Sequence, residues 1–552
     1  MLSSRFPLCR LSSSVFSSRR AYHSHPPARS MATSPAAHSS GAGHRAFIAL
    51  GSNLGGPLRL HYIEEAIKEL KGTVGSIEST SCLYETPPAY VDPASMPPFL
   101  NAAVAVRTAI GDPSEVVRRL KAIEARFGRR RDSHGRRGEK RQYVARTIDM
   151  DLLFLDDAVC LREDDPLWVE VPHPRLHERN FVLEPLMDID PHFIHPALGE
   201  TISSLWDSNR EQASEKGPED GRTARPRRVF AVGSRLWQMD DGGTPRIMGI
   251  LNVTPDSFSD GSVHNASVED SVKRALEMED QGADIIDIGG ESTRPGAVPP
   301  SEEEEMRRVL PVIRRLKEES SVPISVDTRR AVVAQAAVEA GADLVNDVSG
   351  GVADSQMWPL LEDYIGRRDY PRGVSYCLMH MRGNPDTMTK LTDYQDVSAE
   401  VAMWLKDRCE RLMQRGIPRW RILADVGIGF AKTAEQSYRL LRDLGKVQCG
   451  LPRGIPQLVG FSRKRLLGAT TAEGKARRML KRESEDQSTP PPQNGYPSSS
   501  LAKRDPQELE DRKWGGAACT AWCVQQGVFM LRTHDINETR CVVDVMQKIM
   551  NT

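Results

Sequence analysis

The chain has 552 residues, of which 39% are hydrophobic and 27% charged, and its net charge at neutral pH is −1. At about 150 residues per domain this length predicts roughly three or four domain-sized units, and the hydrophobic content excludes a wholly disordered protein. The balanced charge gives no general attraction to nucleic acid or to a membrane surface. No apolar run reaches the ~18 residues that a membrane-spanning helix needs. The nine cysteines are sparse. Cys519 and Cys523 are four residues apart, and we expect them to be buried, reduced thiols and not a zinc site.

The first 45 residues have the composition of a targeting segment. They contain six arginines, twelve serines and no acidic residue, and the first carboxylate of the chain is Glu64. Such a composition is typical of an organellar transit peptide, and an ordinary disordered tail is the alternative. We therefore expect location in the mitochondrial matrix, and Met31 offers a second start that would leave a cytosolic form.

Two polar segments divide the rest of the chain. Residues 207–228 contain almost no apolar side chains, which predicts an interdomain linker. Residues 472–513 include the run PPPQNGYPSSS, in which no core could form, and we predict a disordered insertion there. The predicted domains are therefore 46–206 and 229–552.

The first domain combines strand and helix patterns without regular alternation. Strands are predicted over 46–51, 76–86, 99–106 and 148–155, and helices over 58–70 and 114–128. Strands without crossover helices between them indicate an α+β domain, with an antiparallel or mixed sheet on which helices pack.

Two aspartates on the last of these strands carry the first chemical signal. Asp149 and Asp151 are two residues apart, so a strand places both carboxylates on one face. Their neighbours Ile148, Met150 and Leu152 are apolar, and two half-buried like charges are unfavourable unless a cation lies between them. Mg²⁺ carrying nucleotide phosphates fits this pair, and a strand with one solvent-facing polar side is the alternative.

A basic segment precedes the aspartates. Its cations are Arg129, Arg130, Arg131, Arg136, Arg137, Lys140, Arg141 and Arg146. Residues 136–141 read as a solvated loop, whereas Arg129, Arg131 and Arg146 bracket the acidic strand. Cations beside a carboxylate–metal pair fit polyphosphate transfer. The chain has no GxxxxGK[ST] motif, which excludes a P-loop enzyme.

At these residues the chain resembles the 6-hydroxymethyl-7,8-dihydropterin pyrophosphokinase family. The stretches FIALGSNLG, YETPP, FLNAAVAV, ARTIDMDLLF and VPHPRLHERNFVLEPL carry the resemblance over about residues 46–200. It implies transfer of the β,γ-diphosphate of ATP to the pterin hydroxymethyl group, with two Mg²⁺ on Asp149 and Asp151. It assigns ATP contacts to Arg129, Arg131, Arg146, His173 and Arg179. It assigns the pterin slot to Thr86, Pro87, Phe99, Asn101 and Phe181.

The second domain alternates apolar runs with helical stretches. The runs are RIMGILN, ADIIDIGG, PISVDT, DLVNDVSG, SYCLMH, RILADVG, QLVGFS and VFMLRTH. Near-continuous apolar strands separated by helices indicate a parallel sheet covered on both faces. Eight such units over this length predict an α/β TIM (β/α)8 barrel.

Polar residues follow every one of these runs. They are Asn252, Asp287, Glu291, Asp327, Asn346, His380, Asp425, Ser462, Lys464, Arg532 and His534. In a barrel all of them lie at the C-terminal rim, where active sites are found. Helix capping is the alternative for Asp327 and Asp425, but agreement at eight positions favours one site.

The rim residues also suit one kind of ligand. Asn252 and Asp256 offer oxygen ligands to a hard cation. An anion clamp is predicted from the cations of the last two strands: Arg463, Lys464, Arg532 and His534. The acids and amide of the central strands offer acceptors to a flat heterocycle with several N–H groups. The sequence therefore predicts a site for a phosphorylated nitrogen heterocycle with Mg²⁺.

This half of the chain resembles the dihydropteroate synthase family. The stretches GILNVTPDSFSDG, DIIDIGGESTRPGA, VDTRR, NDVSGG, MHMRGNPDTM, DVGIGFAKT, VGFSRK and LRTHDI carry the resemblance from about residue 245 onward. It implies that metal and pyrophosphate bind Asn252, that pyrophosphate also binds Arg532 and His534, and that the pterin binds Asp327, Asn346, Asp425 and Lys464. It places the p-aminobenzoate site at Thr293, Arg294, Pro295, Phe430 and Ser462.

Together the resemblances predict a bifunctional transferase of folate biosynthesis. The first domain would use ATP and release AMP, and the second would condense the pterin pyrophosphate with p-aminobenzoate to 7,8-dihydropteroate. The residues expected to act in catalysis are Arg129, Arg131, Arg146, Asp149, Asp151, Asp425 and Lys464. We expect two Mg²⁺ in the first site and one in the second. Expected partners are small molecules, with neither nucleic acid nor membrane, and a homo-oligomer through the barrel stays open.

Two other functions fit parts of the chain. A pterin-binding methyltransferase shares the barrel and its Asn and Asp pattern, but has no use for a pyrophosphate clamp or a fused pyrophosphokinase. A catalytically dead binding protein would have lost a metal acid or a clamp cation, whereas Asp149, Asp151, Lys464, Arg532 and His534 are all present. We also expect no aldolase domain before the first strand, because about 45 residues precede it.

Overall fold

A computed structural model describes residues 43–89, 96–128, 145–216, 224–239, 243–253, 268–292, 298–468, 470, 474 and 506–552. The described residues belong to one compact unit, Gly43–Thr552. Residues 1–42 of the predicted targeting segment and most of the predicted insertion lie outside them, whereas His44 and Arg45 already belong to the first strand. None of the helices in this described part is both long and apolar enough to cross a membrane.

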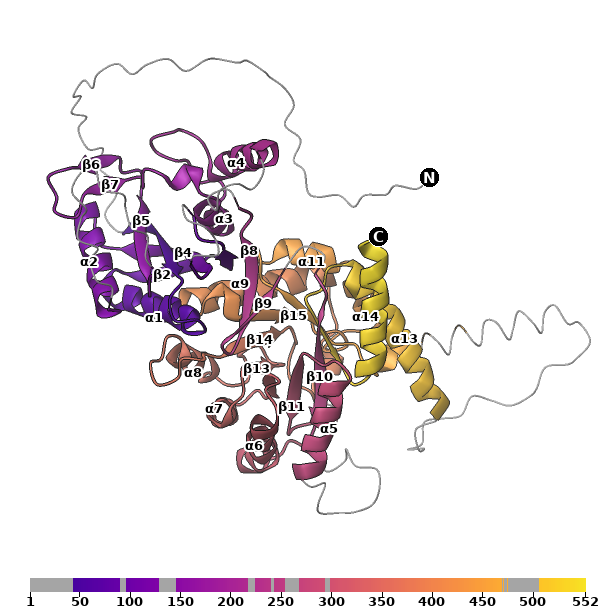
Figure 1. The fold of residues 1–552 in the computed structure, drawn as a ribbon. Helices are drawn as coiled ribbons and strands as arrows, with labels where there is room; N and C mark the ends of the chain where they lie inside the picture. The colour runs from indigo at the N-terminus through magenta and orange to yellow at the C-terminus, as the bar shows by residue number, and fades with distance from the viewer. Residues whose placement is uncertain are drawn as a thin grey trace, which may run out of the picture. The chain divides into compact units, whose positions relative to one another are not determined.

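The first half contains the antiparallel sheet of an α+β domain (Figure 1). Its strands run in the order β5-β1-β4-β3-β8-β9, with β2 paired to β4. Their bounds are β1 His44–Ser52, β2 Ser76–Thr80, β3 Leu83–Thr86, β4 Phe99–Thr108, β5 Asp149–Leu155, β8 Arg227–Val232 and β9 Arg235–Gln238. The helices are α1 Leu58–Thr73, α2 Pro113–Arg126, α3 Asn180–Ile189 and α4 Ile202–Lys216, and a separate hairpin joins β6 Cys160–Arg162 to β7 Val169–Val171.

The helices follow from local signals. α1 buries Leu60, Ile63, Ile67 and Leu70, a spacing that puts them on one face toward the sheet. α2 begins after Asp112, whose side chain accepts the Ser114 N–H, with proline at the first helical position.

One predicted strand is two strands in the structure. Residues 76–86 break at Ser81, whose backbone N–H donates to the Ala103 carbonyl at 2.8 Å while its hydroxyl accepts the Ala103 N–H at 2.9 Å. The next N–H, of Cys82, donates to Asp188 at 2.9 Å. No glycine or proline interrupts residues 76–86, which is why the sequence reads as one element.

The segment predicted as a linker is partly ordered. Residues 207–216 belong to α4, and β8 begins at Arg227 and pairs with β3. The β8–β9 hairpin also packs Phe230, Val232 and Trp237 against buried residues from the early parts of the barrel strands, among them Met248 and Leu344. The hairpin therefore extends the first sheet and closes the N-terminal end of the barrel.

The second half is a closed barrel of eight parallel strands, β10 to β17 in sequence order (Figure 1). The strands are β10 Arg246–Asn252, β11 Ile285–Gly289, β12 Ile324–Asp327, β13 Leu344–Asp347, β14 Ser375–Met379, β15 Ile422–Asp425, β16 Gln457–Val459 and β17 Met530–Thr533. Each predicted apolar run contains one of them, so the predicted (β/α)8 barrel is confirmed.

Helices cover the outside of the barrel. They are α5 Val268–Asp280, α6 Glu302–Glu319, α7 Ala331–Ala340, α8 Met357–Tyr364, α9 Val397–Gln414, α10 Ala434–Arg442, α11 Leu444–Gly450, α13 Pro506–Gln525 and α14 Ile536–Met550. α13 begins inside the predicted insertion, so the prediction of disorder up to residue 513 is wrong at its C-terminal end. Residues from 506 onward form the helix that precedes the last strand.

A short helical turn before β15 attaches the barrel to the first half. Arg421 donates to Glu64 of α1, with Nε 2.8 Å from Oε1, and the two side chains are 0% and 1% exposed. Trp420 Nε1 donates to the same carboxylate at 2.9 Å. Arg419 donates to the backbone carbonyl of Asp188 at 3.0 Å. This contact is therefore a buried, charged interface within one compact unit.

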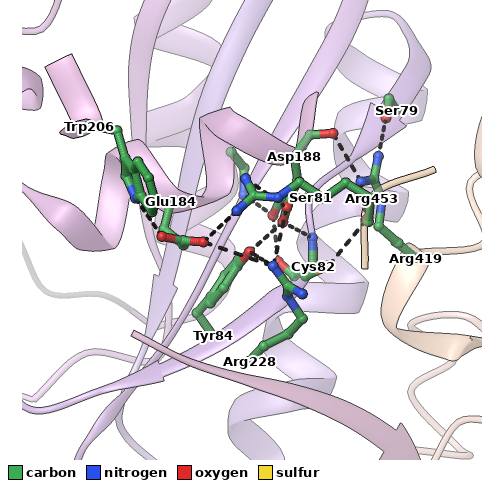
Figure 2. A network of polar contacts seen from close by, with 11 residues as sticks. Ser79, Ser81, Cys82, Tyr84, Glu184, Asp188, Trp206, Arg228, Arg419 and Arg453 are labelled. Carbon is green, nitrogen blue, oxygen red and sulfur yellow. Dashed lines mark hydrogen bonds and ion pairs between the residues drawn. The ribbon is translucent and has the colours of Figure 1, made fainter. Parts of the chain in front are cut away.

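Asp188 at the end of α3 is the centre of a second part of that interface. Figure 2 shows its carboxylate among Cys82, Tyr84, Arg228 and Arg453. The Tyr84 hydroxyl donates to it at 2.6 Å, and Arg453 of the barrel lies 3.6 Å away. Cys82, Tyr84 and Arg228 belong to the first half of the chain, so Arg453 joins Arg419 in linking the barrel to the polar network of that half.

Candidate active sites

The two acids lie on β5, an edge strand of the first sheet. Asp149 and Asp151 alternate with buried Met150, and their side chains are 20% and 38% exposed. Asp149 is paired with Gly51 of β1, which is paired with Asn101 of β4. Directly paired residues share a face, so Asp149 and Asn101 project from the same face with only a glycine between them.

The side chains around that glycine lie close to it. A methyl group at Gly51 would lie 3.3 Å from the Asn101 side-chain oxygen, 3.8 Å from the Phe99 ring and 3.9 Å from Cβ of Asp149. Asn101 in turn donates to Thr86 Oγ1 at 2.7 Å. The structure thus brings four predicted residues, Asp149, Phe99, Asn101 and Thr86, together around Gly51 on one face of the sheet.

Some of the other predicted residues of this site lie in the described part of the chain, and two do not. Phe181 on α3 packs against the apolar cluster on this same face of the sheet, and Pro87 follows β3 half-buried. His173 is held by its N–H on the Leu153 carbonyl at 3.1 Å, and burial lowers its pKa, with Arg179 adding to the effect and Asp151 opposing it. Arg129 and Arg131 lie outside the described residues.

Cations flank both acids. Arg146 forms an ion pair with Asp149. Lys121 of α2 has its Nζ 3.6 Å from Asp151 and 2.7 Å from Glu124, and it donates to the Met150 carbonyl at 2.8 Å. Burial alone would lower the pKa of Lys121, but the surrounding carboxylates raise it overall. Sequence reasoning missed Lys121, because a lysine on an amphipathic helix looks like a solvated residue.

The donor set of β5 fits Mg²⁺. Both carboxylates are partly exposed on one face, and oxygen ligands are what this ion prefers. Within the described ranges no group of three or more His, Cys, Asp and Glu side chains could hold a metal.

The barrel collects its predicted residues at one rim. Asn252, Asp327 and Asp425 end β10, β12 and β15, Asn346 lies in β13, and Arg532 lies in β17. Arg532 donates through Nε to Asp287 and through Nη2 to Asp327, both at 2.6 Å. Asp535, just after β17, is paired with Arg463 at 2.6 Å.

Asp287 is the buried centre of this cluster. Its two oxygens accept Arg532, the Ser325 hydroxyl at 2.6 Å and the Asn346 side-chain amide at 3.1 Å. Burial raises the pKa of Asp327 to about 7, with Asp287 adding to the effect and Arg532 opposing it. Asp287 was expected at the rim but not as a site residue; its role depends on contacts that only the closed barrel creates.

A second cluster surrounds Lys464. Its ammonium donates to the Ile428 carbonyl and lies 4.5 Å from the centre of the Phe430 ring. Burial lowers the pKa of Lys464 to about 8, with Asp425 opposing the shift and Arg532 adding to it. Burial raises the pKa of Asp425, whose carboxylate accepts the Gly427 N–H at 2.8 Å.

Two further rim residues meet between the last strands. The backbone N–H of His534 donates to Ser462 Oγ at 3.1 Å, and its ring Nδ1 lies 3.1 Å from the same oxygen. His380, by contrast, is buried beside Lys432, and these surroundings lower its pKa to about 2. His380 is therefore neutral and no anion ligand. Asp256, Thr293, Arg294 and Pro295 lie outside the described residues.

Comparisons with known proteins match both halves of the chain. A family model described as pterin binding enzyme matches residues 248–534, and one described as 7,8-dihydro-6-hydroxymethylpterin-pyrophosphokinase (HPPK) matches residues 47–191. A crystal structure of Plasmodium falciparum HPPK-DHPS with pteroate has a TM-score of 0.68 at 24% identity, covering 92% of this chain and 98% of that one. This likeness supports the fold.

Relatives match both halves together. The folic acid synthesis protein fol1 of Schizosaccharomyces pombe is 34% identical over 508 residues, covering 91% of this chain but only 59% of that protein. The mitochondrial folate synthesis bifunctional protein of Arabidopsis thaliana is 37% identical over 458 residues, covering 80% of this chain and 77% of its own length. A second Arabidopsis folate synthesis bifunctional protein is 38% identical over 448 residues, covering 76% and 85%. The chain therefore belongs to the family of bifunctional folate synthesis proteins, with a pyrophosphokinase half followed by a pterin-binding barrel.

Proposed function

We propose that the chain catalyses two consecutive steps of folate biosynthesis. The first half transfers a diphosphate from ATP to 6-hydroxymethyl-7,8-dihydropterin and releases AMP. The barrel then joins the product to p-aminobenzoate, forming 7,8-dihydropteroate and pyrophosphate. The observation that carries the proposal is the presence, in one unit, of two carboxylates on one strand beside Asn101 and Thr86, and of a barrel rim with acids, amide and cations.

In the first site the chain's residues bind and orient. Asp149 and Asp151 would hold Mg²⁺, two ions by resemblance, which would neutralise the polyphosphate and stabilise charge in the transfer. Asn101 and Thr86 would hydrogen-bond the pterin edge beside Phe99 and Phe181. Arg146 and Lys121 already lie on the acids, so both are placed to contact the transferred phosphates.

In the barrel the acids would accept N–H groups of the pterin. Asn346 donates its amide to Asp287, which leaves its carbonyl oxygen to face a ligand. Lys464 beside Asp425 would contact the pterin carbonyl, and Arg532, His534 and Asn252 would bind the leaving pyrophosphate, with one Mg²⁺ at Asn252. The arylamine would enter beside Phe430 and Ser462.

One incubation tests the whole proposal. The chain is mixed with hydroxymethyldihydropterin, ATP, Mg²⁺ and p-aminobenzoate, and the products are separated. AMP and dihydropteroate in equal amounts are expected. Formation of ADP in place of AMP would contradict the first step. Absence of dihydropteroate when the pterin pyrophosphate is supplied directly would contradict the second step.

Replacement of Arg532 by Ala should weaken binding of the pterin pyrophosphate by about 2 kcal/mol or more, because a charged hydrogen bond in a partly dry site is lost. Binding of bare hydroxymethylpterin should change far less. Since Arg532 also neutralises Asp287 and Asp327, the ratio of the two affinities is the measured quantity. Equal weakening of both would mean that Arg532 only supports the rim.

The pH dependence of dihydropteroate formation should be a narrow bell. Asp327 must be ionised to accept a pterin N–H, so kcat/KM should fall as pH falls through about 7, where the carboxyl takes up its proton. Lys464 must be protonated to donate, so kcat/KM should fall as pH rises through about 8. A profile that is flat from pH 6 to 9 would contradict both assignments.

We also propose import into the mitochondrial matrix. The acid-free composition of residues 1–45 supports it, and two plant relatives are named mitochondrial. Residues 1–45 fused to a fluorescent protein should direct it to mitochondria, and a diffuse signal would contradict the proposal. A shorter form that starts at Met31 should stay in the cytosol.

A further inference from the structure

The loop that follows β15 carries three groups of the proposed barrel site. Residues 426–433 connect Asp425 to α10. The Gly427 N–H binds Asp425, the Ile428 carbonyl accepts Lys464, and the Phe430 ring lies under the Lys464 ammonium. The position of Lys464 therefore depends on the path of this loop.

The backbone of the loop is unusual. Gly427, Gly429 and Ala431 alternate in the left-handed region, with φ of 68°, 76° and 50°. A methyl group on Gly427 would lie 2.1 Å from the His380 carbonyl oxygen, so the loop touches the end of β14. A non-glycine residue in this region is unfavourable, and something in the surroundings must hold the loop.

Lys432 is the group that holds it. The side chain is buried, and Nζ donates to the carbonyls of Gly427 and Phe430 at 3.0 Å each and of His380 at 3.2 Å. Nζ also lies 3.0 Å from His380 Nδ1. Each of these partners among the described residues is a neutral group. Burying an ammonium group without an ion pair costs free energy. A methionine of similar size would fill the same space without that cost.

We propose that Lys432 is a positioning residue for dihydropteroate formation, which ties the loop after β15 to the end of β14 and thereby places Lys464 and Phe430. This inference rests on the proposed function of the barrel. Lys432 acts through other residues: its four contacts within the described part of the chain all go to the loop and to His380, and none goes to Asp425, Lys464 or Arg532.

The charged groups around Lys432 and Lys464 decide which quantity the test should measure. Asp425, Lys464 and Arg382 act on Lys432, which also contacts the neutral His380, and Asp425 and Arg532 act on Lys464. Burial is the largest cause of the lowered pKa of Lys464. If the loop loosens, water reaches Lys464 and its pKa should rise toward the ordinary value.

The test compares Lys432→Met with the wild-type chain. Dihydropteroate formation should fall about tenfold or more, because a displaced catalytic group lowers the rate steeply. The alkaline limb of kcat/KM, expected near pH 8, should move to higher pH. AMP formation by the same polypeptide should be unchanged, which shows that the chain is folded. Lys446→Met, which removes an exposed lysine on α11, is the matched control and should alter neither activity.

A second variant disturbs the loop with Lys432 intact. Gly427→Ala forces the loop off the His380 carbonyl and should reproduce both the lower rate and the shifted limb. It also decides the matter if Lys432→Met does not fold. An unshifted alkaline limb in Gly427→Ala, or in a folded Lys432→Met, would overturn the positioning role. Absence of dihydropteroate from the wild-type chain would instead overturn the proposed function.

Discussion

An Asp149→Asn variant is expected to form AMP at least about 10²-fold more slowly than the wild-type chain, because one of the two carboxylates proposed to hold Mg²⁺ loses its charge. The amide has nearly the same shape, and Asp149 already has Arg146 beside it, so the fold should be kept. The barrel should still form dihydropteroate when it is given the pterin pyrophosphate directly.

The matched control for this variant is Asp157→Asn. Asp157 is exposed in the turn just after β5, so the same change of charge occurs on the same segment but away from the residues around Gly51. It should leave AMP formation within about twofold of wild type. A joint loss of both activities in Asp149→Asn would mean that the two halves do not hold separate sites.

The largest effect on stability is expected from Glu64→Gln. The change leaves Arg421 buried without its counter-charge, and breaking one partner of a buried ion pair destabilises by about 3–5 kcal/mol. Arg421 cannot turn to solvent, because it also donates to the carbonyls of Gly233 and Arg372 at 2.7 and 2.9 Å. Denaturant unfolding should show the loss, and both activities should disappear over the same denaturant range.

A second pair across the same interface supplies the control. Glu362 lies 3.7 Å from Lys71, and these side chains are 26% and 45% exposed. Glu362→Gln should therefore change the unfolding free energy by less than about 1 kcal/mol. If Glu64→Gln were equally mild, or if the two activities were lost in separate transitions, the charged interface would not join the halves into one cooperative unit.

The barrel could be predicted from the sequence because its strands are buried on both faces. Such strands read as continuous apolar runs, and the polar residue that ends each run marks the rim. The predicted linker could not be read in the same way. Its strand β8 is short and begins with Arg227 and Arg228, and its partner β3 lies far away in the chain.

The sequence predicts which residues belong to the barrel site, but not which of these residues pair with one another. Asp327, Asn346, Asp425, Lys464 and Arg532 were expected at one rim because each follows its own strand. The ion pairs of Arg532 join residues 245 and 205 positions apart, and no local pattern encodes them. Lys121 and Lys432 were missed for another reason: a lysine on a helix or in a polar loop looks solvated until the fold shows it to be enclosed.

The shared β8–β9 hairpin has a consequence for fragments of the chain. A cut between residues 216 and 224 would leave α4 and β8 whole, yet each piece would then carry one unpaired strand edge, β3 in the first and β8 in the second. Unpaired edges recruit other strands. The two pieces should therefore aggregate when made separately and reassemble when made together, so this position is a split site for fragment complementation.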